Sequence, residues 1–167
     1  MAGEPDRDAG RRRALLCFDG SDDAGAAIAR ARDVLGVREA VVLTVYEPFA
    51  GWEPYDPATI VDAPLSRLAA GALGLEQIAQ ELAGETLERG LSLARSAGFD
   101  AQGRTVRGKP WRVICEVADE IDAAAIVLGA RGLSRVGSVL LGSVSFAVAA
   151  HAGRPVLIVP GSGRTGA

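Results

Sequence analysis

The chain has few of the residues that bind transition metals or form disulfide frameworks. Its 167 residues include one histidine and two cysteines, and a single lysine stands against 17 arginines. No spacing typical of zinc ligands is present, so a zinc site built from these residues is excluded. Cys17 and Cys115 lie in apolar runs, and we predict that both are reduced and buried.

Concentrated positive charge and long apolar runs are also missing. The net charge is -3, and the only basic run is Arg11-Arg12-Arg13, so binding of nucleic acid through bulk electrostatics is not expected. No window approaches the ~18 apolar residues of a membrane span. The apolar run 14–18 is shorter than the ~7 to 15 residues of a signal-peptide core. We therefore expect a cytoplasmic protein without a membrane partner.

Aromatic residues make up only 5% of the chain, although 49% of it is apolar. The core must therefore come from Ala, Val, Leu and Ile. This length and composition fit one globular domain. We predict a single domain over residues 14–160, between a disordered N-terminal tail (1–13) and a flexible C-terminal tail (161–167).

Short apolar runs alternate with helical patterns between the two tails. Strands are expected at 14–18, 40–46, 101–106, 124–128 and 155–159. Helical patterns lie between them: one ending at Gly36, a long one over 68–94 with a break near Gly84, one opening at Pro110, and one over 143–151. This alternation predicts an α/β fold, a doubly wound five-stranded parallel sheet in the order 3-2-1-4-5 with helices on both faces. The third and fifth strands would be its edges.

In such a sheet, ligands bind beyond the carboxyl ends of the strands where the winding direction reverses. Strands 1 and 4 meet at this point, and they end in Asp19-Gly20-Ser21 and in the glycine-rich segment 129–132. The next helix begins near Gly142-Ser143, where unpaired backbone N–H groups favour an anion. Taken singly, each glycine could be a simple turn and Ser143 a plain N-cap. Together they favour a phosphate site, to which Arg131 or Arg135 could add charge.

The spacing of these residues resembles a known motif. Gly129, Gly132, Gly142 and Ser143 form Gly-x2-Gly-x9-Gly-Ser, which is similar to the ATP-binding motif of the universal stress protein family. The resemblance spans roughly residues 14–160 and includes these further segments: Phe-Asp-Gly-Ser at 18–21, Val-Leu-Thr-Val at 42–45, Gly-Lys-Pro at 108–110, Ile-Val-Leu-Gly at 126–129 and Arg-Pro-Val-Leu-Ile-Val-Pro at 154–160.

The resemblance implies a fold of the adenine nucleotide alpha hydrolase type and ATP, with magnesium, as the ligand. Asp19 would hold the ribose or adenine, the Val45 backbone would meet the adenine edge, and Gly129 would line the ribose. The phosphates would be cradled by Gly132, Gly142, Ser143, Val144 and Ser145, with the two serine hydroxyls as donors. The resemblance also implies a homodimer through the strand Val156–Val159, and an open apolar edge there favours the same pairing.

Two segments depart from the family pattern. Phe18 would crowd the base if its ring pointed inward, and the proline-rich stretch from Glu47 to Pro64 has no family match and is expected to be a long loop.

Enzymatic signatures are weak. Lys109 follows no phosphate-binding glycine loop and is interpreted as a solvated turn residue. The segment after strand 1 has no Ser-Gly-Gly-x-Asp-Ser order, so we predict no catalytic residue.

The favoured hypothesis is an ATP-binding stress-response module with an unknown protein partner and at most slow hydrolysis. The alternatives are a stress protein that acts through dimer and partner contacts without nucleotide, and a true ATP-dependent enzyme.

Overall fold

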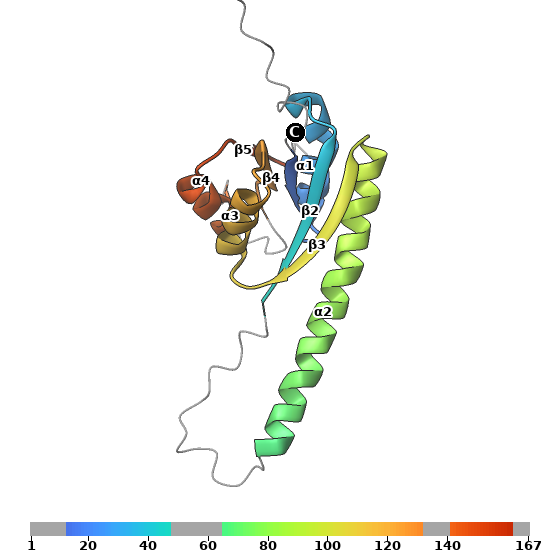
Figure 1. The fold of residues 1–167 in the computed structure, drawn as a ribbon, viewed down its shortest axis with the longest axis vertical. Helices are drawn as coiled ribbons and strands as arrows, with labels where there is room; N and C mark the ends of the chain where they lie inside the picture. The colour runs from blue at the N-terminus through green and yellow to red at the C-terminus, as the bar shows by residue number, and fades with distance from the viewer. Residues whose placement is uncertain (1–12, 48–64, 132–140, 162–167) are drawn as a thin grey trace, which may run out of the picture.

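Strands and helices alternate in the computed structural model, which describes residues 13–47, 65–131 and 141–161, the side chains of 65–73 excepted. The strands are β1 (Ala14–Cys17), β2 (Glu39–Tyr46), β3 (Asp100–Arg107), β4 (Ala125–Gly129) and β5 (Val156–Val159). The helices are α1 (Asp22–Leu35), α2 (Leu65–Ser96), α3 (Pro110–Glu120) and α4 (Ser143–His151). All strand pairs are parallel, and the order is β3-β2-β1-β4-β5. The predicted doubly wound sheet is therefore confirmed, with β3 and β5 as its edges (Figure 1).

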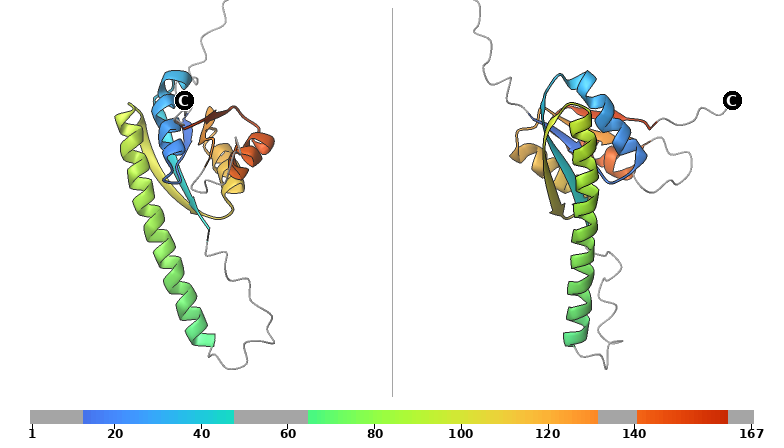
Figure 2. Two further views of the ribbon diagram at one scale, coloured as in Figure 1. Left: turned by 180° about the vertical axis from the view of Figure 1, so that it is seen from behind. Right: turned by 90° about the vertical axis from the view of Figure 1, so that its right-hand side faces the viewer.

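The two faces of the sheet carry different helix pairs. Helices α1 and α2 cover one face, and α3 and α4 cover the other (Figures 1 and 2). Side chains of β1 alternate between the two cores, as the pleat of a strand requires. Leu16 and Phe18 belong to the α1–α2 side, whereas Leu15 and Cys17 belong to the α3–α4 side. The sheet is thus buried on both faces, which explains why its central strands are almost wholly apolar.

Local signals at the helix ends agree with the sequence. The Ser21 side chain caps α1 by accepting a hydrogen bond from the Ala24 N–H at 3.2 Å. Gly36 ends that helix in the left-handed conformation with φ 66°, which glycine adopts without strain. Pro110 opens α3 in its first turn, where its missing N–H costs nothing.

Helix α2 differs from the expectation of a break near Gly84, because it runs without interruption from Leu65 to Ser96. Its C-terminal half packs on β2 and β3, and its N-terminal half extends beyond the sheet (Figure 1). Leu75, Ile78 and Leu82 are exposed on this helix. One glycine lowers helix stability by only about 1 kcal/mol, which packing of the other turns offsets. Among the described helices, none is long and apolar enough to cross a membrane.

Residues near both ends of the described chain contact the rest of the structure. Arg13, which the sequence assigned to the tail, is held by the domain: its carbonyl accepts the Ala124 N–H, and its side chain pairs with Glu39 at 3.2 Å. At the other end Gly161 lies against the carboxylate of Asp23. The remainder of both predicted tails, and residues 48–64 of the proline-rich loop, fall outside the described residues.

Candidate nucleotide site

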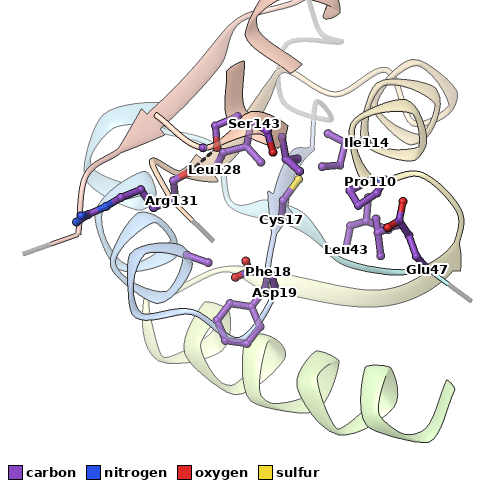
Figure 3. Close-up of a pocket in the computed structure, with 16 residues that line it drawn as sticks. Cys17, Phe18, Asp19, Leu43, Glu47, Pro110, Ile114, Leu128, Arg131 and Ser143 are labelled. Carbon is purple, nitrogen blue, oxygen red and sulfur yellow. Dashed lines mark hydrogen bonds between the residues drawn. The ribbon is translucent and has the colours of Figure 1, made fainter. Parts of the chain in front are cut away.

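A pocket of about 480 Å³ opens at the carboxyl ends of the central strands, on the face covered by α3 and α4. This volume is in the usual range for small-molecule sites. Its walls come from β1, β2 and β4, the first turns of α1 and α3, and the start of α4 (Figure 3). The lining residues are Cys17, Phe18, Asp19, Ala24, Leu43, Val45, Glu47, Pro110, Ile114, Leu128, Gly129, Arg131, Gly142, Ser143, Val144 and Ser145.

The N-terminus of α4 forms one end of this pocket. Gly142 is the N-cap, and its own N–H donates to the Ala130 carbonyl at 2.7 Å. The first hydrogen bond of the helix runs from the Phe146 N–H to the Gly142 carbonyl at 2.9 Å. The N–H groups of residues 143–145 therefore have no partner within the helix. Together with the helix dipole, they make this end of the pocket favourable for an anion.

The two serines of this turn have different surroundings. Ser143 is exposed at the pocket. Ser145 is buried, and its hydroxyl donates to the Gly129 carbonyl at 2.8 Å. A hydroxyl carries one hydrogen, so in this structure the Ser145 side chain ties α4 to the end of β4 and does not offer its proton to the pocket. The expectation that both hydroxyls donate to a ligand therefore fits Ser143, whereas Ser145 can offer its backbone N–H.

Gly129 at the end of β4 has a packing role that the sequence did not reveal. A Cβ built on it would lie 2.6 Å from the Ala24 nitrogen and 2.7 Å from the Asp23 carbonyl carbon. The first turn of α1 thus rests directly on the backbone of β4. Both obstructing atoms belong to the main chain, so no side-chain rotation can make room. Gly129 is needed for this close approach, which also sets where α1 borders the pocket.

Asp19 lies directly after β1, and its side chain shapes the turn into α1. Its Oδ1 accepts the Ser21 N–H at 2.9 Å, and Gly20 between them has φ 88°. The carboxylate is exposed at the pocket mouth. Asp19 therefore stabilises the turn with one oxygen and leaves the other available to a hydroxyl donor.

Arg131 also lines the pocket, but its guanidinium is engaged elsewhere. Its Nε lies 3.2 Å from Oδ2 of Asp23, with 40% of the Arg131 side chain and 14% of the Asp23 side chain exposed. Gly161 packs against the same carboxylate. The ion pair links the segment after β4 to the first turn of α1, so Arg131 would have to leave Asp23 to reach an anion at α4.

The opposite end of the pocket is mainly apolar. Leu43 from β2 lies beside Pro110 and Ile114 from α3, and Cys17 lies between this group and Leu128 (Figure 3). Val45 from β2 also lines the pocket. Burial raises the pKa of the Cys17 thiol, and Cys115 and Asp19 raise it further, so Cys17 is a neutral wall residue and not a nucleophile. Cys115 is only half-buried, so the prediction of two buried cysteines is confirmed for Cys17 alone.

Phe18 does not obstruct this end of the pocket. Its ring points toward α2, on the other face of the sheet (Figure 3). The ring is 3% exposed and sits against Gly90, where a Cβ would approach Phe18 Cδ1 to 2.8 Å. The inward orientation considered from the sequence is therefore wrong, because strand alternation places Cys17, the smaller neighbour, at the pocket.

Eight of the nine predicted site residues line the pocket: Asp19, Val45, Gly129, Arg131, Gly142, Ser143, Val144 and Ser145. Gly132, the ninth, lies outside the described residues, as does Arg135. The sequence analysis included Val45 but missed Leu43 and Glu47, which lie two residues to either side of it. The period-2 alternation of β2, which puts Leu43, Val45 and Glu47 on one face, is the signal that could have identified them.

Two further features limit the chemistry of this site. His151 is exposed at the far end of α4 and stacks on Trp111 with ring centroids 4.8 Å apart, so it takes no part in the pocket. Among the described residues, no cluster of three or more His, Cys, Asp or Glu could hold a metal ion. What the pocket offers is an apolar slot at one end and helix N–H groups at the other.

Known proteins share this fold and sequence pattern. The sequence model of the universal stress protein family matches residues 10–160. A universal stress protein encoded in the QAH/OAS sulfhydrylase 3′ region of Thermus aquaticus is 34% identical over 149 residues, which cover 87% of this chain and 96% of the relative.

Solved structures agree with this relationship. The structure of hypothetical protein MJ0577 superimposes with a TM-score of 0.72 at 21% identity, covering 95% of this chain and 99% of the other. A universal stress protein in complex with cAMP superimposes with a TM-score of 0.57 at 25% identity, covering 92% and 99%. Since the family model covers most of the sequence and the Thermus relative matches along nearly its whole length, the chain belongs to the universal stress protein family.

Proposed function

We propose that this protein binds ATP in the pocket between β1, β2 and β4, and that nucleotide occupancy regulates its contacts with a partner protein. The observation that carries the proposal is the N-terminus of α4, whose N–H groups at residues 143–145 have no intrahelical acceptor and border a pocket with an apolar far end. A triphosphate satisfies such donors, and a purine fits the apolar slot. A relative solved with cAMP adds support for an adenine nucleotide.

The predicted residues divide into groups along this ligand. The Val45 backbone would meet the adenine edge, and Asp19 would accept from a ribose hydroxyl, with Gly129 beside the ribose. The phosphates would take the N–H groups of Ser143, Val144 and Ser145, the Ser143 hydroxyl and the turn at Gly142. Gly132 completes this group in the proposal, although it lies outside the described residues.

Arg131 is assigned a conditional role in this proposal. Its half-exposed guanidinium pairs with Asp23, and a polyphosphate carries more charge than one carboxylate. We expect Arg131 to exchange Asp23 for the phosphates when nucleotide binds. Magnesium would be carried by the phosphates and water, as is usual for this ion.

Co-purified nucleotide provides the first test. Heat or acid denaturation of the purified protein should release adenine nucleotide that chromatography can identify and quantify. Titration of nucleotide-free protein with ATP in a calorimeter should then show one site per chain. Protein without released nucleotide and without heat on ATP addition would overturn the proposal and favour a family member that acts through protein contacts alone.

We assign no catalytic residue, so hydrolysis is expected to be slow at most. Asp19, one of the two carboxylates that line the pocket, holds the turn after β1 through its bond to the Ser21 N–H. Release of phosphate from ATP and magnesium, followed over hours, separates a binding module from an enzyme. Multiple turnovers per minute would contradict the binding role. A cytoplasmic location remains a prediction from the sequence.

Within the described residues β5 is the outermost strand on its side of the sheet, and this edge favours a homodimer. The carbonyls of Pro155 and Val159 accept N–H groups from Ile126 and Ala130 on the β4 side, so by alternation the backbone of Val156 and Ile158 points to the free edge. Leu157 and its neighbours on β5 are half-buried, and Phe146 on α4 is exposed. A second copy of the strand would satisfy this edge and cover its apolar side chains.

A proline substitution can test the dimer through the backbone. Ile158→Pro removes an N–H that points away from β4, so it should block pairing between copies while leaving the sheet intact. Ile158→Ala, which keeps the N–H, is the matched control. Light scattering at micromolar concentration should show the proline variant as a monomer and the alanine variant as a dimer. A wild-type monomer would end the proposal.

A further inference from the structure

The pocket is electrostatically asymmetric along its length. At one end lie the N-terminus of α4 and Arg131. At the other end lies Glu47, the first residue after β2, whose side chain extends toward Pro110 at the start of α3 (Figure 3). A triphosphate is attracted to the first end and repelled by the carboxylate at the second. In the proposed site, the base of a bound nucleotide would therefore point toward Glu47.

Glu47 is positioned to meet the edge of that base. It lies on the same face of the β2 segment as Leu43 and Val45, because side chains two residues apart point the same way. Leu43 and Val45 supply apolar contact to the faces of a ring, whereas Glu47 supplies the polar group at the end of the slot. This group was not among the residues that the sequence singled out.

The charge of Glu47 is not neutralised within the described structure. Two cationic residues come from the neighbouring β3–α3 connection, and neither pairs with it: Arg107 pairs with Glu76 at 3.5 Å, and Lys109, which precedes Pro110, forms no ion pair with Glu47. In residues 13–47, 65–131 and 141–161, no hydrogen-bond donor engages this carboxylate. Both of its oxygens can accept hydrogen bonds, and an ionised carboxylate can only accept.

We infer that Glu47 makes the pocket selective for a purine with an amino group at position 6 over a purine with an oxo group there. The inference rests on the proposed nucleotide site and adds the residue that reads the base. Adenine presents two N–H donors at position 6, which a carboxylate can accept. Hypoxanthine and guanine present a carbonyl oxygen, which meets a second acceptor and is left without a donor.

Competition between ATP and inosine triphosphate tests this role, because these two ligands differ at position 6 and share ribose and phosphates. Wild-type protein should bind ATP at least about tenfold more tightly, as expected for one charge-assisted hydrogen bond. Glu47→Ala should lower the ratio of the two affinities severalfold, and the Val45 backbone, which meets the same base in the proposed site, should keep the remainder. Glu47→Gln, whose amide can also donate, should bind inosine triphosphate better than wild type does.

Glu39→Gln is the matched control, since Glu39 lies at the opposite end of β2 and pairs with Arg13. It should keep the wild-type ratio. Because Glu47 is exposed, its variants should retain the wild-type melting temperature. An unchanged ratio in Glu47→Ala, or an equal loss of both ligands, overturns the inference and leaves the nucleotide site standing. Wild-type protein that binds neither triphosphate overturns the proposed function itself.

Discussion

The two faces of the sheet are built from the same strands, yet one is sealed and the other holds the pocket. On the α1–α2 side, Phe18 fills the space over Gly90 and is 3% exposed. On the α3–α4 side, the preceding residue is Cys17, a smaller side chain that lines an opening of about 480 Å³. The contrast shows that a cavity at a strand end depends on the size of single residues as well as on topology.

The largest expected effect on stability comes from replacing Phe18 by alanine, and the same replacement of its neighbour Cys17 provides the comparison. Phe18→Ala should lower the free energy of unfolding by about 3–5 kcal/mol, because it leaves a cavity in a closed core. Cys17→Ala should cost about 1 kcal/mol or less, since it only widens an existing pocket. Urea denaturation of the two variants measures both values. Equal losses would contradict the division into a sealed and an open face.

A second prediction concerns two glycines with different surroundings. Gly129→Ala should destabilise the protein by about 1–3 kcal/mol, because the added Cβ meets main-chain atoms of α1. Gly84→Ala should stabilise it by about 0.5–1 kcal/mol, since nothing lies within 4 Å and alanine favours an uninterrupted helix. Thermal unfolding of both variants checks the signs. Loss of stability in Gly84→Ala would argue against a continuous α2.

Substitutions at the pocket on the α3–α4 face should change ATP affinity more than they change the stability of the fold. Ser143→Ala and Gly142→Asp should each weaken ATP binding by about tenfold or more, the first by removing a donor and the second by adding a carboxylate beside the phosphates. Neither should destabilise the fold, because Asp is a good N-cap residue and Ser143 is exposed.

Ser145→Ala should show the opposite pattern. It removes the hydrogen bond to the Gly129 carbonyl and should cost about 1–3 kcal/mol of stability. Calorimetric ATP titration and urea denaturation of all three variants separate the two roles. Normal ATP binding by both Ser143→Ala and Gly142→Asp would remove α4 from the phosphate site.

The smallest expected effect on stability comes from breaking an exposed ion pair at the edge of the α3–α4 face. Arg104 on β3 and Glu120 at the end of α3 form an exposed ion pair at 2.9 Å. A hydrogen bond from Arg104 lowers the pKa of Glu120 below its ordinary 4.5. Its contribution to stability is therefore present above that ordinary value and is lost as the pH falls through the lowered pKa.

Glu120→Gln should accordingly change the melting temperature only slightly at pH 7. The difference from wild type should disappear as the pH falls through the lowered pKa of Glu120, because the carboxyl group then becomes protonated. Melting curves from pH 3 to 7 test the sign. A difference that grows toward low pH would contradict the ion pair as its source.

Much of the fold could be predicted from local patterns. The apolar runs and the turn residues Asp19-Gly20-Ser21, Gly36 and Pro110 located every strand and helix to within one or two residues in most cases. The position of the site followed from topology, because the carboxyl ends of β1 and β4 must meet where the winding reverses. The uninterrupted course of α2 through Gly84 could not be predicted, since packing elsewhere on the helix outweighs one glycine.

The amino-acid sequence by itself determined the order of the elements, the sheet topology and the set of residues around α4, because periodicity, turn chemistry and glycine spacing are local properties. Only the tertiary structure decided which face of the sheet each of these side chains lies on and which residue it contacts. It turned Phe18 to the sealed face, tied the Ser145 hydroxyl to Gly129, paired Arg131 with Asp23 and placed Glu47 at the pocket beside Pro110. These outcomes depend on contacts between residues far apart in the chain, whose distances and relative free energies no local pattern specifies.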